Sequence, residues 1–468
     1  MRTLIQGGTV ATGSDLFVAD VLLEGESVAA VGVDLSKLGP FDRTVDARGK
    51  YVLPGGVDPH VHLQLTMGNG MVSSDDFETG TRAAAFGGTT TVIDFAAQPK
   101  GGSLAAGLEQ RHQEAQGKAV VDYGFHLTVR SATKEALAEL DSMIAREGVS
   151  SFKLFTAYPG FYQLDDGSLL RVLQRTRENG GLVCVHAENG PAIEVLVEQA
   201  LARGETAPRF HALTRPARLE GEATSRCIAL AEVAGAPLYV VHLTARESLE
   251  PVREARLRGQ TVWAETCPQY LLLSQRDIEA PGQEGAKVVF SPPVRAPGNE
   301  EHLWRGLALG DLATVGTDHC PFLFKGQKDQ AARFTEIPNG LPGIETRLLI
   351  LWEEGVRKGR FDVNRFVQLV STEPAKIFGL YPKKGALVPG ADADVVVWDP
   401  ERRQSLSAAA LHMRTDYSPY EGRTVKGAPA MVFGRGELIV DDGRWLGRPG
   451  RGRFLKRGTR PAVKGAAS

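Results

Sequence analysis

The sequence has little cysteine and no strong excess of charge of either sign. Its four cysteines are scattered through 468 residues, at spacings that fit neither a disulfide framework nor a zinc finger. The formal net charge is −2, so nothing in the charge balance indicates a nucleic-acid or anionic-membrane partner. These scarcities predict a reduced protein that does not bind nucleic acid.

Long apolar runs are absent too. No segment is long and apolar enough to span a bilayer, and the opening residues, MRTLIQGG, lack the apolar run of a signal peptide. We therefore expect a cytoplasmic protein with no membrane partner. A chain of 468 residues is too long for one small core, and it suits a barrel with an accessory domain.

Both ends of the chain consist of short strand-like runs separated by glycine turns. Such runs occupy residues 18–23, 28–33, 395–398 and 437–440. The shared pattern at the two ends indicates that they fold together. We predict that residues 1–52 and 385–445 form one small, discontinuous β-sandwich domain.

The remaining residues, 446–468, form a basic C-terminal tail that is rich in arginine and glycine. That composition alone allows an RNA-binding arm. The tail has few aromatic residues, however, and the rest of the chain has no basic surplus. We therefore expect a solvated extension, or an arm that contacts a neighbouring subunit.

The middle of the chain, residues 53–384, alternates apolar strand-like runs with helical stretches such as 168–179 and 222–234. This alternation is typical of βα units and a parallel sheet. Eight strands are the number that closes a TIM-like (β/α)8 barrel, the α/β fold that we predict, and a doubly wound sheet is the competing topology. We expect the eight strands to end near His62, Phe95, Val129, Thr156, Glu188, Thr244, Cys267 and Asp318.

A His-x-His pair stands at the end of the first of these strands. Alternate side chains of a strand share a face, so His60 and His62 point the same way, about 6.6 Å apart along the backbone. Two imidazoles in this arrangement can bind one metal ion, and Asp58 on the same face offers a supporting partner or a base. An isolated His-x-His is more often a surface pair. The assignment therefore depends on partners elsewhere in the chain.

Three candidate partners stand at the ends of other predicted strands. His186 and His242 each end an apolar run before a polar turn, and Asp318 is the exit of a third run. Each has a plain structural interpretation, as a core histidine or a turn aspartate. In a barrel the carboxyl ends of the strands meet at one face, where catalytic groups gather. The set therefore predicts a metal site.

Lys153 lies inside the apolar run SFKLF, which a barrel strand would bury. A buried ammonium is costly unless it is paired or its pKa falls. One interpretation is a lysine whose head reaches the rim of the barrel. The functional interpretation is a neutral amine that is chemically modified and so loses its positive charge beside cations.

The segments that carry these residues resemble the cyclic amidohydrolases, most closely the dihydropyrimidinase and D-hydantoinase branch. The resemblance spans residues 1–445, and its motifs are PGGVDPHVH at 54–62, FKLF at 152–155, VHAEN at 185–189, VHL at 241–243 and GTDHCPF at 316–322. It implies two metal ions, usually zinc, although cobalt or manganese also suits such ligands. His60, His62 and Asp318 would hold one ion, and His186 and His242 the other. A CO2-derived carbamate on Lys153 would bridge both.

The resemblance also implies a mechanism. A water between the two ions becomes a nucleophile near neutral pH, and Asp318 serves as general base and then general acid. Tyr158 would contact the substrate and the oxyanion, although alone it is equally well explained as a surface loop residue. Main-chain groups of Ser291 and Asn339 would contact the amide and imide atoms of the ring.

Residue 64 separates the relatives within this family. Dihydroorotases place an arginine there to pair with the substrate carboxylate, whereas this chain has Gln64. We therefore expect hydrolysis of 5,6-dihydropyrimidines or 5-substituted hydantoins to N-carbamoyl amino acids. We also expect an apolar rim around the exocyclic substituent of the substrate, formed by Leu65, Met67, Phe155, Tyr158 and Tyr162.

Two other functions stay open at this point: an allantoinase-type ring hydrolase, and a non-catalytic dihydropyrimidinase-like scaffold that has lost its metal. The full set of candidate ligands argues against the scaffold. The family resemblance alone implies a homotetramer.

Overall fold

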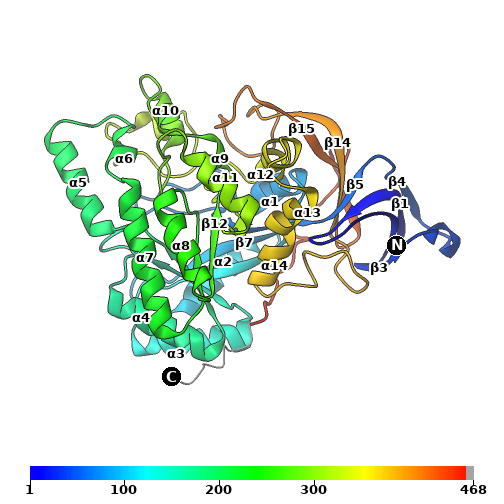
Figure 1. The fold of residues 1–468 in the computed structure, drawn as a ribbon, viewed down its shortest axis with the longest axis horizontal. Helices are drawn as coiled ribbons and strands as arrows, with labels where there is room; N and C mark the ends of the chain where they lie inside the picture. The colour runs from blue at the N-terminus through cyan, green and yellow to red at the C-terminus, as the bar shows by residue number, and fades with distance from the viewer. Residues whose placement is uncertain (460–468) are drawn as a thin grey trace.

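The structure is a computed structural model that describes residues 1–459, and it contains two sheets (Figure 1). The larger sheet has eight strands in the order β13-β12-β11-β10-β9-β8-β7-β6, each parallel to its neighbours. Its strands are β6 (Gly56–Val61), β7 (Thr89–Ala97), β8 (Asp122–Thr128), β9 (Ser151–Phe155), β10 (Leu182–His186), β11 (Leu238–Val240), β12 (Val262–Thr266) and β13 (Thr314–Val315).

The first and last strands of this sheet meet and nearly close it into a barrel. The His62 N–H donates to the His319 carbonyl at 2.8 Å, and the Asp318 N–H donates to the His60 carbonyl at 2.9 Å. A parallel bridge joins Val61 to His319. The predicted barrel is therefore confirmed, and the doubly wound sheet is wrong because such a sheet keeps two open edges.

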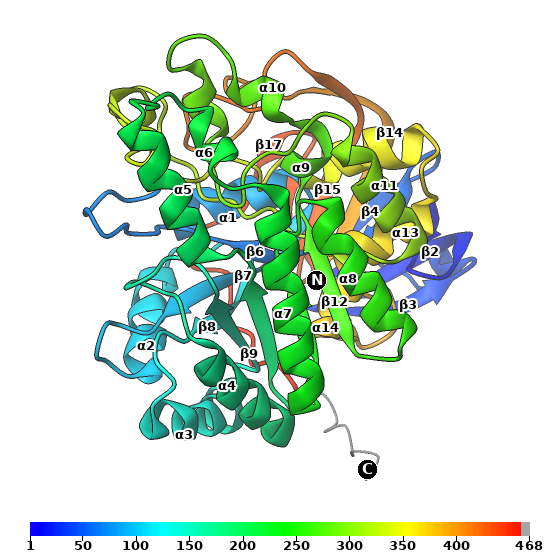
Figure 2. The same cartoon turned by 60° about the vertical axis from the view of Figure 1, so that its left-hand side comes forward.

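Helices surround the barrel strands, and Figure 2 shows α2, α3, α4 and α7 around β7, β8 and β9. These and the neighbouring helices are α1 (Phe77–Phe86), α2 (Leu104–Ala115), α3 (Lys134–Ser142), α4 (Asp166–Asn179), α5 (Gly190–Ala202), α7 (Ala217–Ala234), α8 (Arg246–Leu257) and α11 (Asn299–Leu309). The Asp165 side chain caps the amino end of α4, and Gly180 ends it at φ 77°. Both helical stretches expected from the sequence lie within α4 and α7.

The second sheet joins the two ends of the chain, as predicted. Strand β5 pairs with β1 on one side and with β14 on the other, so it links the N-terminal and C-terminal strands. The sheet has a buried core of its own that includes Ile5, Val21, Val397 and Phe433. Its nine strands are β1 (Arg2–Ala11), β2 (Leu16–Glu24), β3 (Ser27–Gly32), β4 (Arg43–Asp46), β5 (Tyr51–Pro54), β14 (Val395–Ser405), β15 (Thr424–Gly434), β16 (Glu437–Asp441) and β17 (Arg444–Trp445).

A buried lysine fixes this small sheet to the barrel. Lys384 is 1% exposed, and its ammonium lies 2.7 Å from Asp122, the first residue of β8. It also lies 2.9 Å from Asp392 and 2.7 Å from Asp394, just before β14. Burial opposes its charge, but the three carboxylates prevail and raise its pKa. The junction therefore lies at the amino ends of the barrel strands, away from their carboxyl ends.

The C-terminal tail differs from the expected solvated extension. Arg451 and Arg457 are buried, and they donate to the carbonyls of Val120 and Phe125 beside and within β8. The Leu455 N–H also donates to the Tyr123 carbonyl at 2.7 Å. Arginine stems cover apolar surface while their guanidinium groups satisfy strand carbonyls, which is why a basic segment packs here. Residues 460–468 of the predicted tail lie outside the described residues.

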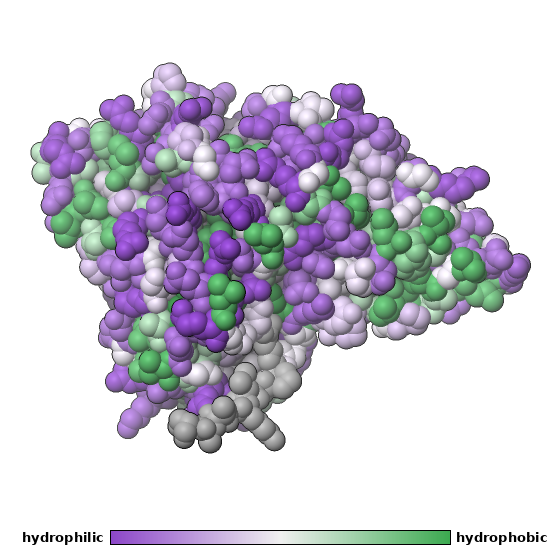
Figure 3. Space-filling view, in the orientation of Figure 1, coloured by the Kyte–Doolittle hydropathy of each residue, from purple (hydrophilic) through white to green (hydrophobic). Residues whose placement is uncertain are grey.

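The surface is mostly hydrophilic on the face shown in Figure 3, with apolar side chains gathered over the small sheet. Leu16, Phe17 and Val18 of β2 are exposed. Within residues 1–459, no helix combines the length and the apolar character that a membrane span requires.

Candidate metal centre and active site

The residues predicted for the site meet in one cavity of about 360 Å³ at the carboxyl ends of the barrel strands. Strands β6, β9 and β10 and the segments after β11 and β13 supply the candidate metal ligands. The cavity is lined by all nine predicted site residues: His60, His62, Lys153, Tyr158, His186, His242, Ser291, Asp318 and Asn339.

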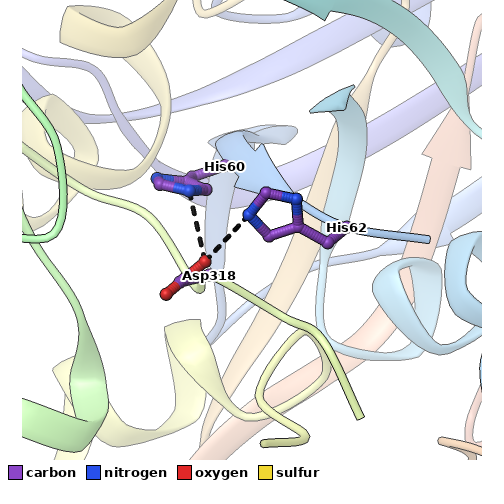
Figure 4. A group of neighbouring side chains, drawn as sticks. All are labelled: His60, His62 and Asp318. Carbon is purple, nitrogen blue, oxygen red and sulfur yellow. Dashed lines mark ion pairs between the residues drawn. The ribbon is translucent and has the colours of Figure 1, made fainter. Parts of the chain in front are cut away.

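His60, His62 and Asp318 form the first group of candidate ligands (Figure 4). The Nε2 atoms of the two histidines lie 3.2 and 3.1 Å from the same Asp318 oxygen, Oδ1. One ligand atom from each residue lies within 4.8 Å of the others. Burial alone would lower the pKa of His60, but the Glu265 and Asp318 carboxylates raise it to about 9.

The second group consists of His186 and His242. His186 Nδ1 faces His242 Nε2 at 2.9 Å, and His186 Nε2 lies 2.8 Å from a Glu188 carboxylate oxygen. The bond to Glu188 selects the tautomer with hydrogen on Nε2, which leaves the Nδ1 lone pair facing His242. Two facing nitrogens of this kind suit a shared cation.

Lys153 lines the same cavity and is 1% exposed. Its amine lies over the rings of Phe95 and Phe155, 5.1 Å from each centroid, and forms no hydrogen bond or ion pair within residues 1–459. Burial lowers the pKa of this amine to about 8. A useful fraction is therefore neutral near physiological pH, and only the neutral amine can react with an electrophile such as CO2.

The donor set fits a divalent metal centre. The buried Nε2 atom of His60 faces the Asp318 carboxylate at 3.2 Å but makes no hydrogen bond of good geometry in the described part of the chain. An unpaired buried nitrogen is costly, so such atoms call for another partner. Imidazole and carboxylate are the donors that zinc and similar ions prefer.

Several site residues adopt backbone conformations that only glycine adopts readily. Asp318, His242 and Tyr158 have φ values of 52°, 37° and 65°. Such strain persists where the surrounding structure fixes it, and it concentrates at functional sites. At Asp318 the bond from its N–H to the His60 carbonyl holds the turn, so its carboxylate faces back toward the two histidines.

Glu265 is a buried carboxylate that the sequence reasoning missed. It is fully buried and accepts hydrogen bonds from His60 Nδ1 at 2.7 Å and from the His242 N–H at 3.1 Å. The Tyr239 hydroxyl donates to its other oxygen at 2.9 Å. Glu265 thus orients one ligand from each group. An acidic residue inside the apolar run VWAET was the available signal, but it does not say which ligands the carboxylate reaches.

Asp58 differs from its expected place beside the ligands. Its carboxylate accepts from the Thr317 hydroxyl at 2.7 Å and lies 3.9 Å from Arg347 Nε. It therefore supports the segment that precedes Asp318. Asp58 is not among the described residues that line the cavity, so it cannot act there as a base.

Gln64 also differs from its expected place. A φ of 52° at this residue breaks the alternation of His60 and His62, and its side chain accepts a hydrogen bond from Lys118 at 3.3 Å. It is not among the residues that line the cavity. A substrate carboxylate would therefore not meet residue 64 in this backbone conformation.

Tyr158 and Ser291 form a polar pair at the cavity wall. Burial raises the pKa of the Tyr158 phenol, and its hydrogen bond with Ser291 opposes this shift only in part, so the phenol keeps its proton. The Tyr158 ring lies 5.4 Å from the His186 ring between centroids. A protonated phenol beside a candidate ligand can donate to a negatively charged oxygen.

We predict that Glu265→Gln weakens zinc binding by about 10- to 100-fold, because the His60 N–H loses its carboxylate acceptor. Competition with a chelator at fixed pH measures the affinity. Glu220→Gln is the matched control, since Glu220 is equally buried but bonds Arg295 and Thr244. Equal affinities of the wild type and Glu265→Gln would contradict this role.

Comparison with known proteins places the chain in a family. The amidohydrolase family pattern matches residues 51–439. The chain is 50% identical to the D-hydantoinase of Geobacillus stearothermophilus over 458 residues, 98% of this chain and 97% of that protein. It is 51% identical to the D-hydantoinase of Streptomyces coelicolor over 462 residues, 98% of each.

A solved structure gives the same result. The crystal structure of dihydropyrimidinase from Brevibacillus agri NCHU1002 is similar with a TM-score of 0.96 and 49% identity, over 98% of this chain and 100% of that one. The residues matched by the family pattern include every residue that lines the cavity. The chain therefore belongs to the amidohydrolase family, in its group of D-hydantoinases and dihydropyrimidinases.

Proposed function

We propose that this enzyme hydrolyses a cyclic amide bond of 5,6-dihydropyrimidines or 5-substituted hydantoins and releases N-carbamoyl amino acids. The observation that carries the proposal is the convergence of two candidate ligand groups, a buried lysine and a phenol on one cavity. The names of the relatives support the substrate class.

His60, His62 and Asp318 would hold one divalent ion, and His186 and His242 the other, with zinc the expected metal. Bound ions of this kind supply Lewis acidity that lowers the pKa of water and polarises a carbonyl. The Glu265 and Glu188 carboxylates fix the ring orientations of His60 and His186.

Asp318 is the proposed proton carrier. Burial alone would raise its pKa, but the His60 and His62 imidazoles beside the carboxylate hold that pKa well below its ordinary value. The side chain is therefore a carboxylate at neutral pH. It can take a proton from the attacking water and return it to the ring nitrogen as the C–N bond breaks. The Tyr158 phenol can donate a hydrogen bond to the oxyanion that forms when the water adds to the ring carbonyl.

The charges of the cavity favour uncharged rings. Apart from the histidines, Lys153 is the one cationic side chain among the described residues that line it. A carbamate on Lys153 would remove this positive charge as well. A ring that carries a carboxylate, such as dihydroorotate, would then find no cationic side chain. Gln64 does not contribute to this preference, because it lies outside the cavity lining.

We predict that the zinc-loaded protein opens dihydrouracil and hydantoin, and that it turns over dihydroorotate poorly. The rate of ring opening of these compounds and of allantoin, monitored by the loss of ultraviolet absorbance, measures the substrate preference. Asp318→Asn is the control, with an expected loss of about 10²- to 10⁴-fold in kcat. Turnover of dihydroorotate alone would overturn the substrate class, and turnover of allantoin alone would favour the allantoinase alternative. A protein that binds no transition metal and opens no ring would be the scaffold.

We infer that the Lys153 amine carries a carbamate. Its neutral form attacks the carbon of CO2, a nitrogen–carbon bond forms, and the nitrogen loses a proton. The product is an anionic carbamate, so the buried side chain no longer carries a positive charge that lacks an ion-pair partner. Its two oxygen atoms are donors suited to two metal ions.

This inference predicts that metal reconstitution needs CO2. Protein stripped with a chelator and reloaded with zinc in CO2-free buffer should recover at least about tenfold less activity than protein reloaded with added bicarbonate. Lys153→Met should stay inactive in both buffers, because it has no amine to modify. Full recovery of the wild type without CO2 would contradict the carbamate.

An apolar rim for the exocyclic substituent is a separate proposal. Leu65 and Met67 line the cavity together with four aromatic residues at the end of β9 and in the loop after it, Phe155, Tyr158, Phe161 and Tyr162. Phe155 and Tyr162 stack with their ring centroids 5.0 Å apart. An apolar substituent at ring position 5 would be buried against these side chains.

We predict that Leu65→Ala or Tyr162→Ala changes the ratio of kcat/KM for 5-phenylhydantoin to that for hydantoin by about tenfold, because buried apolar contacts are lost. Leu257→Ala is the control, since Leu257 is 86% exposed on α8. If both rim variants kept the wild-type ratio of kcat/KM for the two hydantoins, the proposed apolar rim would be wrong.

A further inference from the structure

A fully buried lysine outside the metal centre bonds two segments that reach the cavity. Lys328 is 0% exposed, and its Nζ lies 2.9 Å from the Pro338 carbonyl, 3.0 Å from that of Val289 and 3.2 Å from that of Ala286. Three acceptors match the three N–H donors of an ammonium. Burial lowers the pKa of Lys328 to about 7.

A buried histidine holds the neighbouring carbonyl. His211 Nε2 lies 2.8 Å from the Phe290 carbonyl, and its Nδ1 accepts from Arg215 at 3.2 Å. Burial, with help from the Arg215 charge, lowers the pKa of His211 well below its ordinary value. The ring is therefore neutral, and the bond from Arg215 leaves its hydrogen on Nε2, facing Phe290.

These two carbonyls determine where two N–H groups point. In a trans peptide the carbonyl and the following N–H lie in one plane and point in opposite directions. The peptides that end in Ser291 and Asn339 are not among the cis bonds of the chain. A bond to the Phe290 carbonyl therefore aims the Ser291 N–H, and a bond to the Pro338 carbonyl aims the Asn339 N–H.

Both N–H groups are available to a ligand. Ser291 and Asn339 line the cavity, and neither N–H has a hydrogen-bond partner within residues 1–459. Backbone N–H groups without a partner are rare, because leaving one unpaired away from water is costly. The Gly340 N–H, in contrast, donates to the Val289 carbonyl at 3.1 Å and ties the two segments together.

We propose that Lys328 and His211 are positioning residues, which aim the main-chain N–H groups of Asn339 and Ser291 at the carbonyl oxygens of a cyclic imide or ureide. The inference rests on the proposed function and extends it. Side-chain substitutions at residues 291 and 339 leave these donors in place. Recognition of the ring therefore depends on buried groups that never touch it.

The test measures kcat, KM and metal content for hydantoin and dihydrouracil in Lys328→Met and His211→Leu. Both variants should raise KM about tenfold for both rings, with kcat within threefold of the wild type and metal content unchanged, because the metal ligands are untouched. His211→Gln should restore a KM close to that of the wild type, since its amide can donate to the Phe290 carbonyl from the place of Nε2. If Lys328→Met fails to fold, the two His211 variants decide.

Lys384→Met is the matched control, because it also removes a buried lysine but holds no segment of the cavity. Its Tm should fall while its KM stays within twofold of the wild type. The inference would be overturned if KM stayed unchanged in His211→Leu and in folded Lys328→Met. It would also be overturned if His211→Gln raised KM as much as His211→Leu does. A wild type that opens neither ring would overturn the proposed function first, and the inference with it.

Discussion

The contact between the first barrel strand and the segment after the last one is the constraint on which the site depends. Two backbone hydrogen bonds make it, from His62 to His319 and from Asp318 to His60. They close the eight-stranded sheet, and they also bring Asp318 against two histidines more than 250 residues away in the sequence. The same bonds hold Asp318 at a positive φ, which turns its carboxylate toward the imidazoles. Closure of the fold and assembly of the first ligand group are thus one event.

Burial of ionisable groups is the second theme of this structure. Lys153, Glu265, Lys328 and Lys384 are all nearly inaccessible, and each would be costly without partners. Lys384 is surrounded by carboxylates, Lys328 by carbonyls and Glu265 by N–H and O–H donors. The Lys153 amine lies over two aromatic rings and has no hydrogen-bonded or ion-paired partner within residues 1–459, and it lines the cavity. Lys153, the buried ionisable group with the fewest stabilising partners, is therefore the one for which we propose a covalent modification.

Much of the fold and site followed from local patterns, because barrel strands are apolar runs whose ends carry the functional residues. The eight strands, the six candidate metal ligands and the joining of the chain ends were predicted from such runs, whereas the roles of Tyr158, Ser291 and Asn339 came from the family resemblance. Gln64 and Asp58 were misplaced because a positive φ and a contact with Thr317 redirect side chains that strict alternation would send into the cavity. The burial of the tail was missed because composition does not reveal which carbonyls an arginine can satisfy. The homotetramer and the cytoplasmic location stay predictions.

The sequence by itself determined the order of strands and helices, the types of ligand atom and the family, since these depend on local periodicity and on short motifs. Only the tertiary structure decided which atoms meet: Glu265 with His60, Lys328 with the Pro338 carbonyl, His211 with the Phe290 carbonyl. These partners are 205, 10 and 79 residues apart in the chain. No local pattern encodes such separations, because the contacts exist only once the barrel has brought the strand ends and loops to one face.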